Sequence, residues 1–322
     1  MAPNPAKRIR LPLNGVLLLD KPVGFSSNDA LIKAKRLINA QKGGHTGTLD
    51  PFATGVLPLC FGEATKFAQD LLDADKTYET VIHLGIMTTT GDTEGEVLAT
   101  SEVNVTREQI DRVLEQFRGP IQQVPPMYSA LKRDGKPLYE YARAGITLER
   151  EARDVTIHVL EFLDYQAPYL RLRVACSKGT YIRVLGEDIG AALGCGAHLQ
   201  ALRRIQVGHL TLLGCVTLDQ VMATAEAERA SLLAPVDSLL SSFPEVVLPE
   251  SLAKRFLQGQ RLTLTKEGVP LPANAGRVRV YREPTDSVDA SHERQLLGTA
   301  QLHEYGVLAP ERLIATSQQS AA

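Results

Sequence analysis

The stretch GGHTGTLDPFATGVLPLCFGEATK, residues 43 to 66, gathers one histidine, two acids and several glycines around a proline. Glycines at 43, 44 and 47 permit positive φ angles and close backbone approach, and Pro51 restricts Asp50 to extended conformations. The backbone therefore aims the Asp50 carboxylate, which predicts an active-site loop. The alternative, which composition alone favours, is a glycine-rich turn in which Asp50 caps the residues that follow.

Flanking segments predict a regular framework around this loop. The run GVLLLD at 15 to 20 is typical of a buried strand, and Ser26 or Ser27 is expected to cap the helix that follows. Further elements are expected downstream: strands at 77 to 84 and 169 to 177, a helix at 106 to 117 with a T-x-x-Q cap, and a helix with the stripe Ile182, Leu185, Ile189 and Leu193.

The C-terminal third changes character. Residues 215 to 250 contain six acids and one arginine and are helical in tendency, which suggests a bridging region. A capped helix at 251 to 258 and the short alternating segments RLTL, RVRVY, LLGTAQL and YGVLAP predict a compact β module. We expect the loop 284 to 294 to be mobile and the tail after residue 315 to be disordered.

Composition describes an ordinary globular protein. Hydrophobic residues make up 44% and charged residues 22% of the chain, and no apolar run approaches the roughly 20 residues of a membrane span. The N-terminal residues lack the pattern of a secretory signal, so we expect a cytoplasmic protein. Its four cysteines, Cys60, Cys176, Cys195 and Cys215, are widely separated and are expected to be reduced packing residues. No metal site is predicted.

Net charge is −2, which does not by itself indicate a nucleic-acid protein. Residues 1 to 50 nevertheless hold eight Lys or Arg against three Asp, so charge is polarised along the chain. A phosphate-facing surface and a simple solvated face both remain compatible with this pattern.

Six ordered segments, taken together, resemble the bacterial tRNA pseudouridine synthase B (TruB) family, stand-alone enzymes that isomerise uridine 55 in the T arm of tRNA. They are distributed over nearly the whole of residues 10 to 210. Besides GGHTGTLDPFATGVLPL they are GVLLLDKPVGFSSNDAL at 15 to 31, ADKTYE at 74 to 79, VPPMYSALKRDGKPLYEYARAG at 124 to 145, SKGTYIRVLGEDIG at 177 to 190, and CGAHLQALRR at 195 to 204.

The resemblance implies an α+β pseudouridine synthase fold, with a mixed, mostly antiparallel central sheet flanked by helices and a small C-terminal β-rich PUA-like domain. It places the catalytic domain at residues 10 to 247 and the RNA-binding PUA-like domain at 248 to 316, before a disordered tail at 317 to 322. It also implies that residues 122 to 153 form a thumb over the RNA stem, with Lys132, Arg133 and Arg143 as RNA-binding residues. Residues 130 to 154 hold six basic and five acidic side chains, so structural roles for several of them stay open.

For the site, the resemblance assigns catalysis to Asp50, Tyr78 and Arg183. Asp50 must be ionised, and a guanidinium beside it would favour that form and orient it through paired hydrogen bonds. A cation in the first turn of a helix gains nothing from the helix dipole, which also indicates a carboxylate partner for Arg183. Tyr78 would stack on the uracil, and its hydroxyl could take the C5 proton.

Further residues are implied as substrate-binding. His45 would insert into the T loop where the flipped base was, by stacking, although an isolated histidine is more often structural. Lys21 and Pro22 would buttress the active site, and Tyr181 and Leu202 would line the uracil pocket, with ordinary core as the alternative for Leu202.

The reaction needs no redox partner or group donor, and the sequence contains no dinucleotide, nucleotide or metal-binding motif, so no cofactor is expected. The expected partner is the tRNA T stem-loop, bound by a monomer without guide RNA, membrane or obligate protein partner. Three alternatives remain: a guide-RNA-dependent relative, which would lack most of the thumb; an RNA-folding factor, compatible with catalysis; and a glycoside hydrolase, which generally needs a second carboxylate.

Overall fold

The computed structural model describes residues 9–284 and 294–315. Within these ranges nine strands form one sheet, whose main path runs β1-β3-β12-β4-β11-β10-β7, with β2 on β3 and β13 on β12. Every pairing is antiparallel except that of β3 with β12. The strands are β1 (Gly15–Lys21), β2 (Gly43–His45), β3 (Thr54–Phe61), β4 (Lys76–Leu84), β7 (Gly119–Gln123), β10 (Arg153–Gln166), β11 (Tyr169–Cys176), β12 (Ala197–Val207) and β13 (Leu210–Thr211).

Helices and short 3-10 turns surround this sheet, and the buried core lies between the sheet and α1, α3 and α5. Residue spacing explains which face of a helix is buried. In α5 the buried face is the predicted stripe Ile182, Leu185 and Ile189. The α-helices are α1 (Ser27–Leu37), α2 (Ala68–Leu72), α3 (Arg107–Gln116), α4 (Leu138–Arg143), α5 (Ile182–Ala192), α6 (Leu218–Ala223) and α7 (Glu250–Leu257). The 3-10 helices are η1 (Gly62–Phe67), η2 (Leu212–Gly214), η3 (Glu226–Leu232), η4 (Val236–Leu239) and η5 (Glu304–Gly306).

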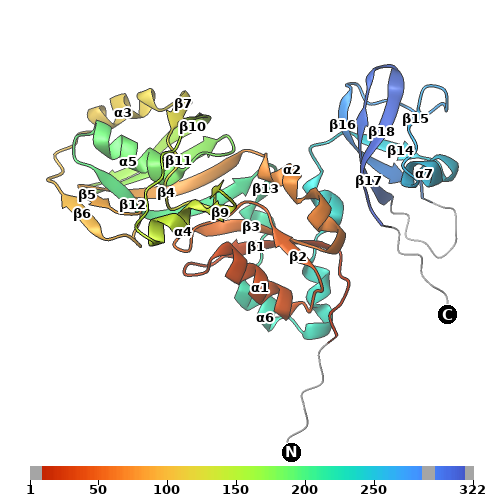
Figure 1. The fold of residues 1–322 in the computed structure, drawn as a ribbon, viewed down its shortest axis with the longest axis horizontal. Helices are drawn as coiled ribbons and strands as arrows, with labels where there is room; N and C mark the ends of the chain where they lie inside the picture. Colours follow the sequence, from red (N-terminus) through yellow and green to blue (C-terminus); the bar gives the residue numbers. More distant parts are fainter. Residues whose placement is uncertain (1–8, 285–293, 316–322) are drawn as a thin grey trace, which may run out of the picture.

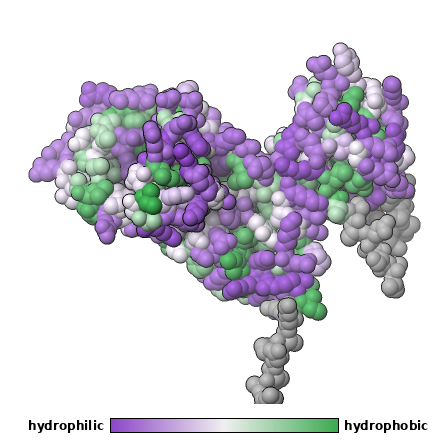
Figure 2. Space-filling model, viewed as in Figure 1, coloured by the Kyte–Doolittle hydropathy of each residue, from purple (hydrophilic) through white to green (hydrophobic). Residues whose placement is uncertain are grey.

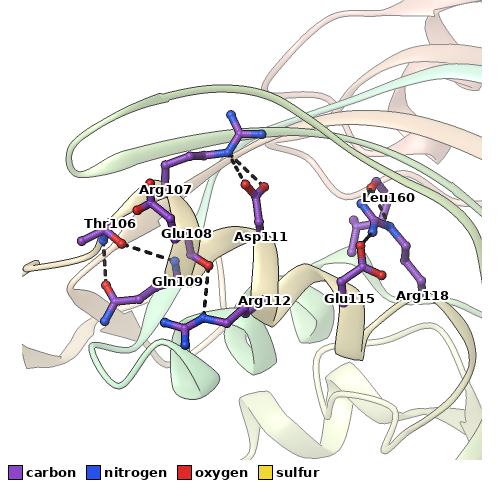
Figure 3. Close-up of polar contacts among 9 residues, drawn as sticks. All are labelled: Thr106, Arg107, Glu108, Gln109, Asp111, Arg112, Glu115, Arg118 and Leu160. Carbon is purple, nitrogen blue, oxygen red and sulfur yellow. Dashed lines mark hydrogen bonds and ion pairs between the residues drawn. The ribbon is translucent and has the colours of Figure 1, made fainter.

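Helix α3 shows how local sequence sets an element boundary. The Thr106 hydroxyl accepts a hydrogen bond from the Gln109 backbone N–H, and the Gln109 side chain accepts one from the Thr106 N–H, which completes the predicted capping box (Figure 3). An i,i+4 ion pair joins Arg107 to Asp111 on the exposed face. Ser26 caps α1 in a similar way, by accepting from the Asp29 N–H at 3.1 Å.

A second, five-stranded sheet forms a separate lobe at the C-terminal end (Figure 1). Its order is β14-β16-β17-β18-β15, and helix α7 packs beside it over a core of its own. The strands are β14 (Glu245–Leu248), β15 (Leu262–Thr263), β16 (Gly276–Arg282), β17 (Gln295–Leu302) and β18 (Val307–Leu313). The predicted fold class, a mixed and mostly antiparallel sheet with helices plus a small β-rich C-terminal domain, is confirmed.

Two hairpins complete the chain: β5 (Ile86–Thr88) with β6 (Val97–Thr100), and β8 (Lys132–Arg133) with β9 (Lys136–Pro137). Some expectations need correction. Helix α7 begins at Glu250 rather than Ser251, and no side chain caps it. The acidic stretch 215 to 250 contains only one six-residue α-helix and two 3-10 helices besides β14. The predicted mobile loop and disordered tail lie almost wholly outside the described residues.

Figure 2 shows a mainly hydrophilic surface with small hydrophobic patches, hollowed between the two lobes. Among the described residues, no helix is long and apolar enough to cross a membrane.

Candidate active site

Asp50 lies in the loop between β2 and β3, and two anchors hold that loop. Its carbonyl accepts a hydrogen bond from the Ala53 N–H at 3.1 Å, closing a turn with Pro51 at the second position. The hydroxyl of Ser27, the first residue of α1, accepts from the Leu49 N–H at 2.8 Å and donates to the Leu49 carbonyl at 3.1 Å. The Asp50 side chain remains 36% exposed, so a ligand can reach a carboxylate whose backbone is fixed.

Arg183 projects from the first turn of α5 and is buried, with 5% of its side chain exposed. Its Nε donates to the Asp50 Oδ2 at 3.0 Å, so the structure brings these two predicted residues together. The expected paired hydrogen bonds are absent among the described contacts, because Nη1 donates to the Thr90 carbonyl at 2.7 Å and Nη2 to the Tyr128 carbonyl at 2.6 Å. Arg183 thereby joins the Asp50 loop to two other segments.

Asp92 is a second carboxylate on the same guanidinium, and sequence reasoning missed it. Its Oδ2 lies 3.5 Å from the Arg183 Nε, and only 4% of its side chain is exposed. Its Oδ1 accepts hydrogen bonds from the Thr90 hydroxyl at 2.5 Å and the Glu94 N–H at 2.9 Å. The acidic turn after β5 was visible in the sequence, but its packing against α5 depends on the fold.

Burial raises the pKa of Asp50, and the neighbouring Asp92 charge raises it further, while Arg183 and Lys21 lower it. The net direction is upward. The guanidinium favours the ionised form of Asp50, as expected, but it offsets only part of the burial effect on the Asp50 pKa.

Lys21 is fully buried at the end of β1. Its Nζ donates to three carbonyls, those of Phe25 at 2.6 Å, Pro22 at 3.0 Å and Pro51 at 3.4 Å. Burial lowers the pKa of Lys21 to about 8, although the Asp50 charge opposes this. Lys21 thus ties the turn after β1, which includes half-buried Pro22, to the residue after Asp50.

Tyr78 and His45 approach the loop from two strands. Tyr78 lies in β4, opposite Val174 of β11 on one side and Arg204 of β12 on the other. Burial raises the pKa of Tyr78, and the positive charge of Arg204 opposes that shift. His45 ends β2, and its Nδ1 is buried without a hydrogen-bond partner in the described structure. Burial and the Arg204 charge both lower the pKa of His45.

Tyr181 and Leu202 occupy different surroundings. Tyr181 precedes α5, where its N–H donates to the Gln123 side chain at 3.0 Å and its carbonyl accepts from it at 3.3 Å. Leu202, 7% exposed, lines a cleft of about 400 Å³ together with Phe52 and Thr93. Tyr181 is not among the residues lining that cleft, so the structure does not bring this predicted pair together there. Gln123, 3% exposed at the end of β7, is a further residue that sequence reasoning missed.

The predicted thumb contains the β8–β9 hairpin and α4. Lys132 and Arg133 form β8 and are exposed, and Arg143 ends α4 with its guanidinium 5.3 Å from the centre of the Tyr139 ring. These cations are therefore open to a polyanion. The Arg183 bond to the Tyr128 carbonyl connects the same segment to the candidate active site.

The cysteines and the remaining acids give no indication of a metal centre. All four cysteines are free, and three of them are buried. Within the described parts of the chain, no three or more His, Cys, Asp or Glu residues cluster in a way that could hold a metal ion. Burial raises the pKa of the Cys60 thiol to about 12, as expected for a packing residue.

Comparison with known proteins covers nearly the whole chain. Residues 35–182 match the model of the TruB family pseudouridylate synthase N-terminal domain, residues 183–241 that of the tRNA pseudouridylate synthase B C-terminal domain, and residues 244–314 that of the pseudouridine synthase II TruB C-terminal region. The chain is 62% identical to tRNA pseudouridine synthase B of Ralstonia pickettii, over 97% of this chain and 98% of that protein. It is 60% identical to that of Burkholderia mallei, over 98% of each. A chain in the crystal structure of a Cbf5-Nop10-Gar1 complex matches 96% of this chain and 90% of its own length, with a TM-score of 0.69 and 25% identity.

Proposed function

Because the chain belongs to the TruB family of pseudouridylate synthases, we propose that it isomerises uridine 55 to pseudouridine in the T arm of tRNA, without guide RNA or cofactor. The observation that supports this best is the partly exposed Asp50 carboxylate held at 3.0 Å by the buried Arg183. The 62% identity to a tRNA pseudouridine synthase B over nearly the full chain supports the choice of substrate.

The proposed reaction exchanges one bond for another. The N1–C1′ bond breaks, the detached uracil rotates while bound, and C5 joins C1′. The C5 proton then leaves, and N1 gains a proton. An ionised Asp50 could stabilise positive character at C1′, take the 2′ proton or attack covalently, so glycal and acylal routes are both compatible with the site.

The remaining residues would prepare that step. Arg183 orients the carboxylate, and Tyr78 stacks on the uracil and takes the C5 proton. The lowered pKa of His45 favours a neutral ring, which suits stacking in the space left by the flipped base. Extruding a base costs on the order of a few kcal/mol in lost stacking. Lys21 and Pro22 would hold the loop, and Tyr181 and Leu202 would line the uracil pocket.

RNA would be held outside the site by two further parts of the chain. The thumb, residues 122 to 153, presents exposed Lys132, Arg133 and Arg143 for backbone phosphates. The C-terminal module, residues 248 to 316 beyond a catalytic domain of residues 10 to 247, would contact RNA as a PUA-like domain. We place the protein in the cytoplasm as a monomer, with tRNA as its partner.

A guide-dependent mode is the principal competitor, because a chain with the same fold occurs in a Cbf5-Nop10-Gar1 complex. The complete thumb segment favours the stand-alone mode. An RNA-folding role can accompany catalysis. Asp92 gives no support to glycoside hydrolysis, because both its oxygens are engaged and its side chain is 4% exposed.

Tritium release from [5-³H]uridine-labelled T-arm RNA tests the proposal, with neither guide RNA nor cofactor added. We expect release by the wild type and none by Asp50→Asn, with both proteins folded and binding RNA. Absence of release from folded wild-type protein that binds the RNA tightly would overturn stand-alone catalysis and favour a guided or RNA-folding role.

A further inference from the structure

Arg204 is a buried cation in an uncommon setting. Its side chain is among the largest fully buried ones, with 1% of the residue exposed. No carboxylate of the described residues forms an ion pair with it. Instead its Nε donates to the Val56 carbonyl at 2.8 Å, and its Nη2 donates to the Gly47 carbonyl at 3.1 Å. A buried charge is costly unless it is compensated, and carbonyls offer only partial negative charge.

Three parts of the candidate active site meet at this guanidinium. Gly47 lies between His45 and Asp50 in the catalytic loop, and Val56 belongs to β3, directly after that loop. Tyr78 is the residue directly opposite Arg204 in the β4–β12 ladder. One side chain therefore contacts the loop backbone on one side and faces the predicted catalytic tyrosine on the other.

The backbone around Arg204 is shaped for close approach. A Cβ added to Gly55 would lie 2.1 Å from the Arg204 carbonyl oxygen, and φ at Gly55 is +105°. A Cβ added to Gly47, where φ is +72°, would lie 3.4 Å from the Arg204 Nη1. The positive φ angles also favour glycine at both positions. Glycines on both sides of Asp50 therefore allow the close approach of Arg204 to the loop.

The charge of Arg204 reaches two predicted site residues. It lowers the pKa of His45 in the same direction as burial does. For Tyr78, burial raises the pKa, and the positive charge of Arg204 lowers it. Removing the cation should therefore raise the pKa of both side chains.

We propose that Arg204 is a positioning residue for the isomerisation: it fixes the His45–Asp50 loop relative to Tyr78 and supplies positive charge beside the Tyr78 hydroxyl. The proposal rests on the proposed function for its catalytic consequence. The contacts of Arg204 and its effect on the pKa of its neighbours exist in the free protein, so they can be measured without RNA.

The first test is an NMR titration of His45 in the free protein. Arg204→Met removes the charge and the donors at similar length, and should raise the pKa of His45. Arg204→Lys keeps the charge and should leave the pKa of His45 close to its wild-type value. Arg203→Met is the matched control, because the Arg203 side chain is 41% exposed and pairs with Asp20 at 2.6 Å. It should leave the His45 titration in place.

The second test separates chemistry from binding by single-turnover tritium release and RNA affinity. Arg204→Met should reduce the rate of the bound complex about 100-fold, as expected when reacting groups shift by about 1 Å, with RNA affinity within about threefold of wild type. If Arg204→Met does not fold, Arg204→Lys decides: it cannot span both carbonyls as a guanidinium does, so its rate should fall while its His45 titration stays.

An unchanged His45 titration in Arg204→Met would overturn the electrostatic role. A folded Arg204→Lys or Arg204→Met protein with the wild-type single-turnover rate would overturn the positioning role. Failure of the proposed function is distinguishable, because wild type itself would then release no tritium while the titrations still report on Arg204.

Discussion

At the residue scale, burial and the guanidinium of Arg183 act in opposite directions on the charge state of Asp50. Asp50 and Asp92 both lie against the Arg183 Nε, at 3.0 and 3.5 Å, and burial outweighs the favourable charge for Asp50. Its pKa is therefore above that of an ordinary carboxyl, about 3.9. If catalysis needs the ionised form, activity is lost as pH falls through this raised pKa, and the acid limb lies above the usual range.

We predict that Asp92→Asn moves this acid limb to lower pH. Asp92 raises the pKa of Asp50, so removing its charge lowers that pKa and extends ionisation to more acidic solutions. The amide keeps an oxygen for the Thr90 hydroxyl. The measurement is the pH dependence of the single-turnover rate between pH 4 and 8.

Asp111→Asn serves as the control, because Asp111 lies in an exposed ion pair on α3 and its loss should leave the limb in place (Figure 3). If the acid limb of the pH–rate profile stays fixed or moves to higher pH in Asp92→Asn, the charge of Asp92 does not govern the pKa of Asp50.

The same residues show what sequence can predict. The pairing of Arg183 with a carboxylate followed from a cation in the first turn of a helix, which is a local argument. Asp92, Gln123 and Arg204 could not be identified in this way, because each becomes a buried partner only through contacts between distant segments. Nor does a sequence reveal how strongly burial raises the pKa of Asp50.

At the element scale, the packing of α5 on β12 determines where Arg183 lies. Gly190 allows this contact: an added Cβ would lie 2.4 Å from the Ala197 Cβ and 2.6 Å from the Ala197 N and the Gly196 carbonyl carbon. Backbone atoms cannot move aside as side chains can, so the helix itself would have to shift. The glycine is a requirement of the helix–strand contact.

We predict that Gly190→Ala lowers the free energy of unfolding by about 1 to 2 kcal/mol. Overpacking typically costs about 1 to 3 kcal/mol, and the better helix propensity of alanine returns up to about 1 kcal/mol. Urea unfolding measures the change. Gly44→Ala is the matched control, because a Cβ there meets nothing within 4 Å, and it should change stability by less than about 0.5 kcal/mol. Equal effects in both variants would contradict the steric argument.

The thumb cations make a second prediction at this scale. Lys132, Arg133 and Arg143 are exposed, and each phosphate contact contributes roughly 0.7 to 0.9 to the slope of log affinity against log salt. Replacing all three by Gln should weaken T-arm RNA binding and reduce that slope by about 2. Binding titrations between 50 and 300 mM salt measure both quantities.

The double variant Arg107→Gln, Arg112→Gln on α3 is the control for charge alone. Helix α3 lies at the edge of the large lobe in Figure 1, and both arginines are exposed on it. A similar loss of slope per charge in this variant would mean that net charge, and not the thumb, determines binding.

Elements whose signals are local were predictable, and those formed by long-range pairing were not. The capping box at Thr106 and the apolar stripe of α5 identified two helices before the structure did. The residue pattern predicts neither β10 nor β12, although β12 connects the two halves of the large sheet. Strand β12 contains Arg203 and Arg204 within its centre, so its polarity obscures a strand that is largely buried.

At the scale of the whole molecule, an ion-pair network fixes the C-terminal sheet against the large lobe. Asp70 of α2 is 3% exposed and pairs with Arg277 of β16 at 2.5 Å and with Arg312 of β18 at 3.6 Å. Arg277 also binds Glu311 at 2.7 Å, and Lys66 donates to the Leu313 carbonyl at 2.9 Å. The two lobes are therefore held in one orientation by charge as well as by apolar contacts.

We predict that Asp70→Asn loosens this junction. The amide keeps the shape and an acceptor but removes the charge near two arginines, and the Arg277 hydrogen bond to a charged group contributes about 1.5 to 3 kcal/mol. Stability of the C-terminal lobe should fall by about that amount, so urea unfolding should separate into two transitions. Small-angle X-ray scattering should show a larger maximum dimension.

Glu267→Gln, which breaks the exposed Arg255 pair inside the lobe, should cost less than about 1 kcal/mol and leave the shape unchanged. If both variants unfold and scatter alike, apolar packing alone orients the C-terminal lobe.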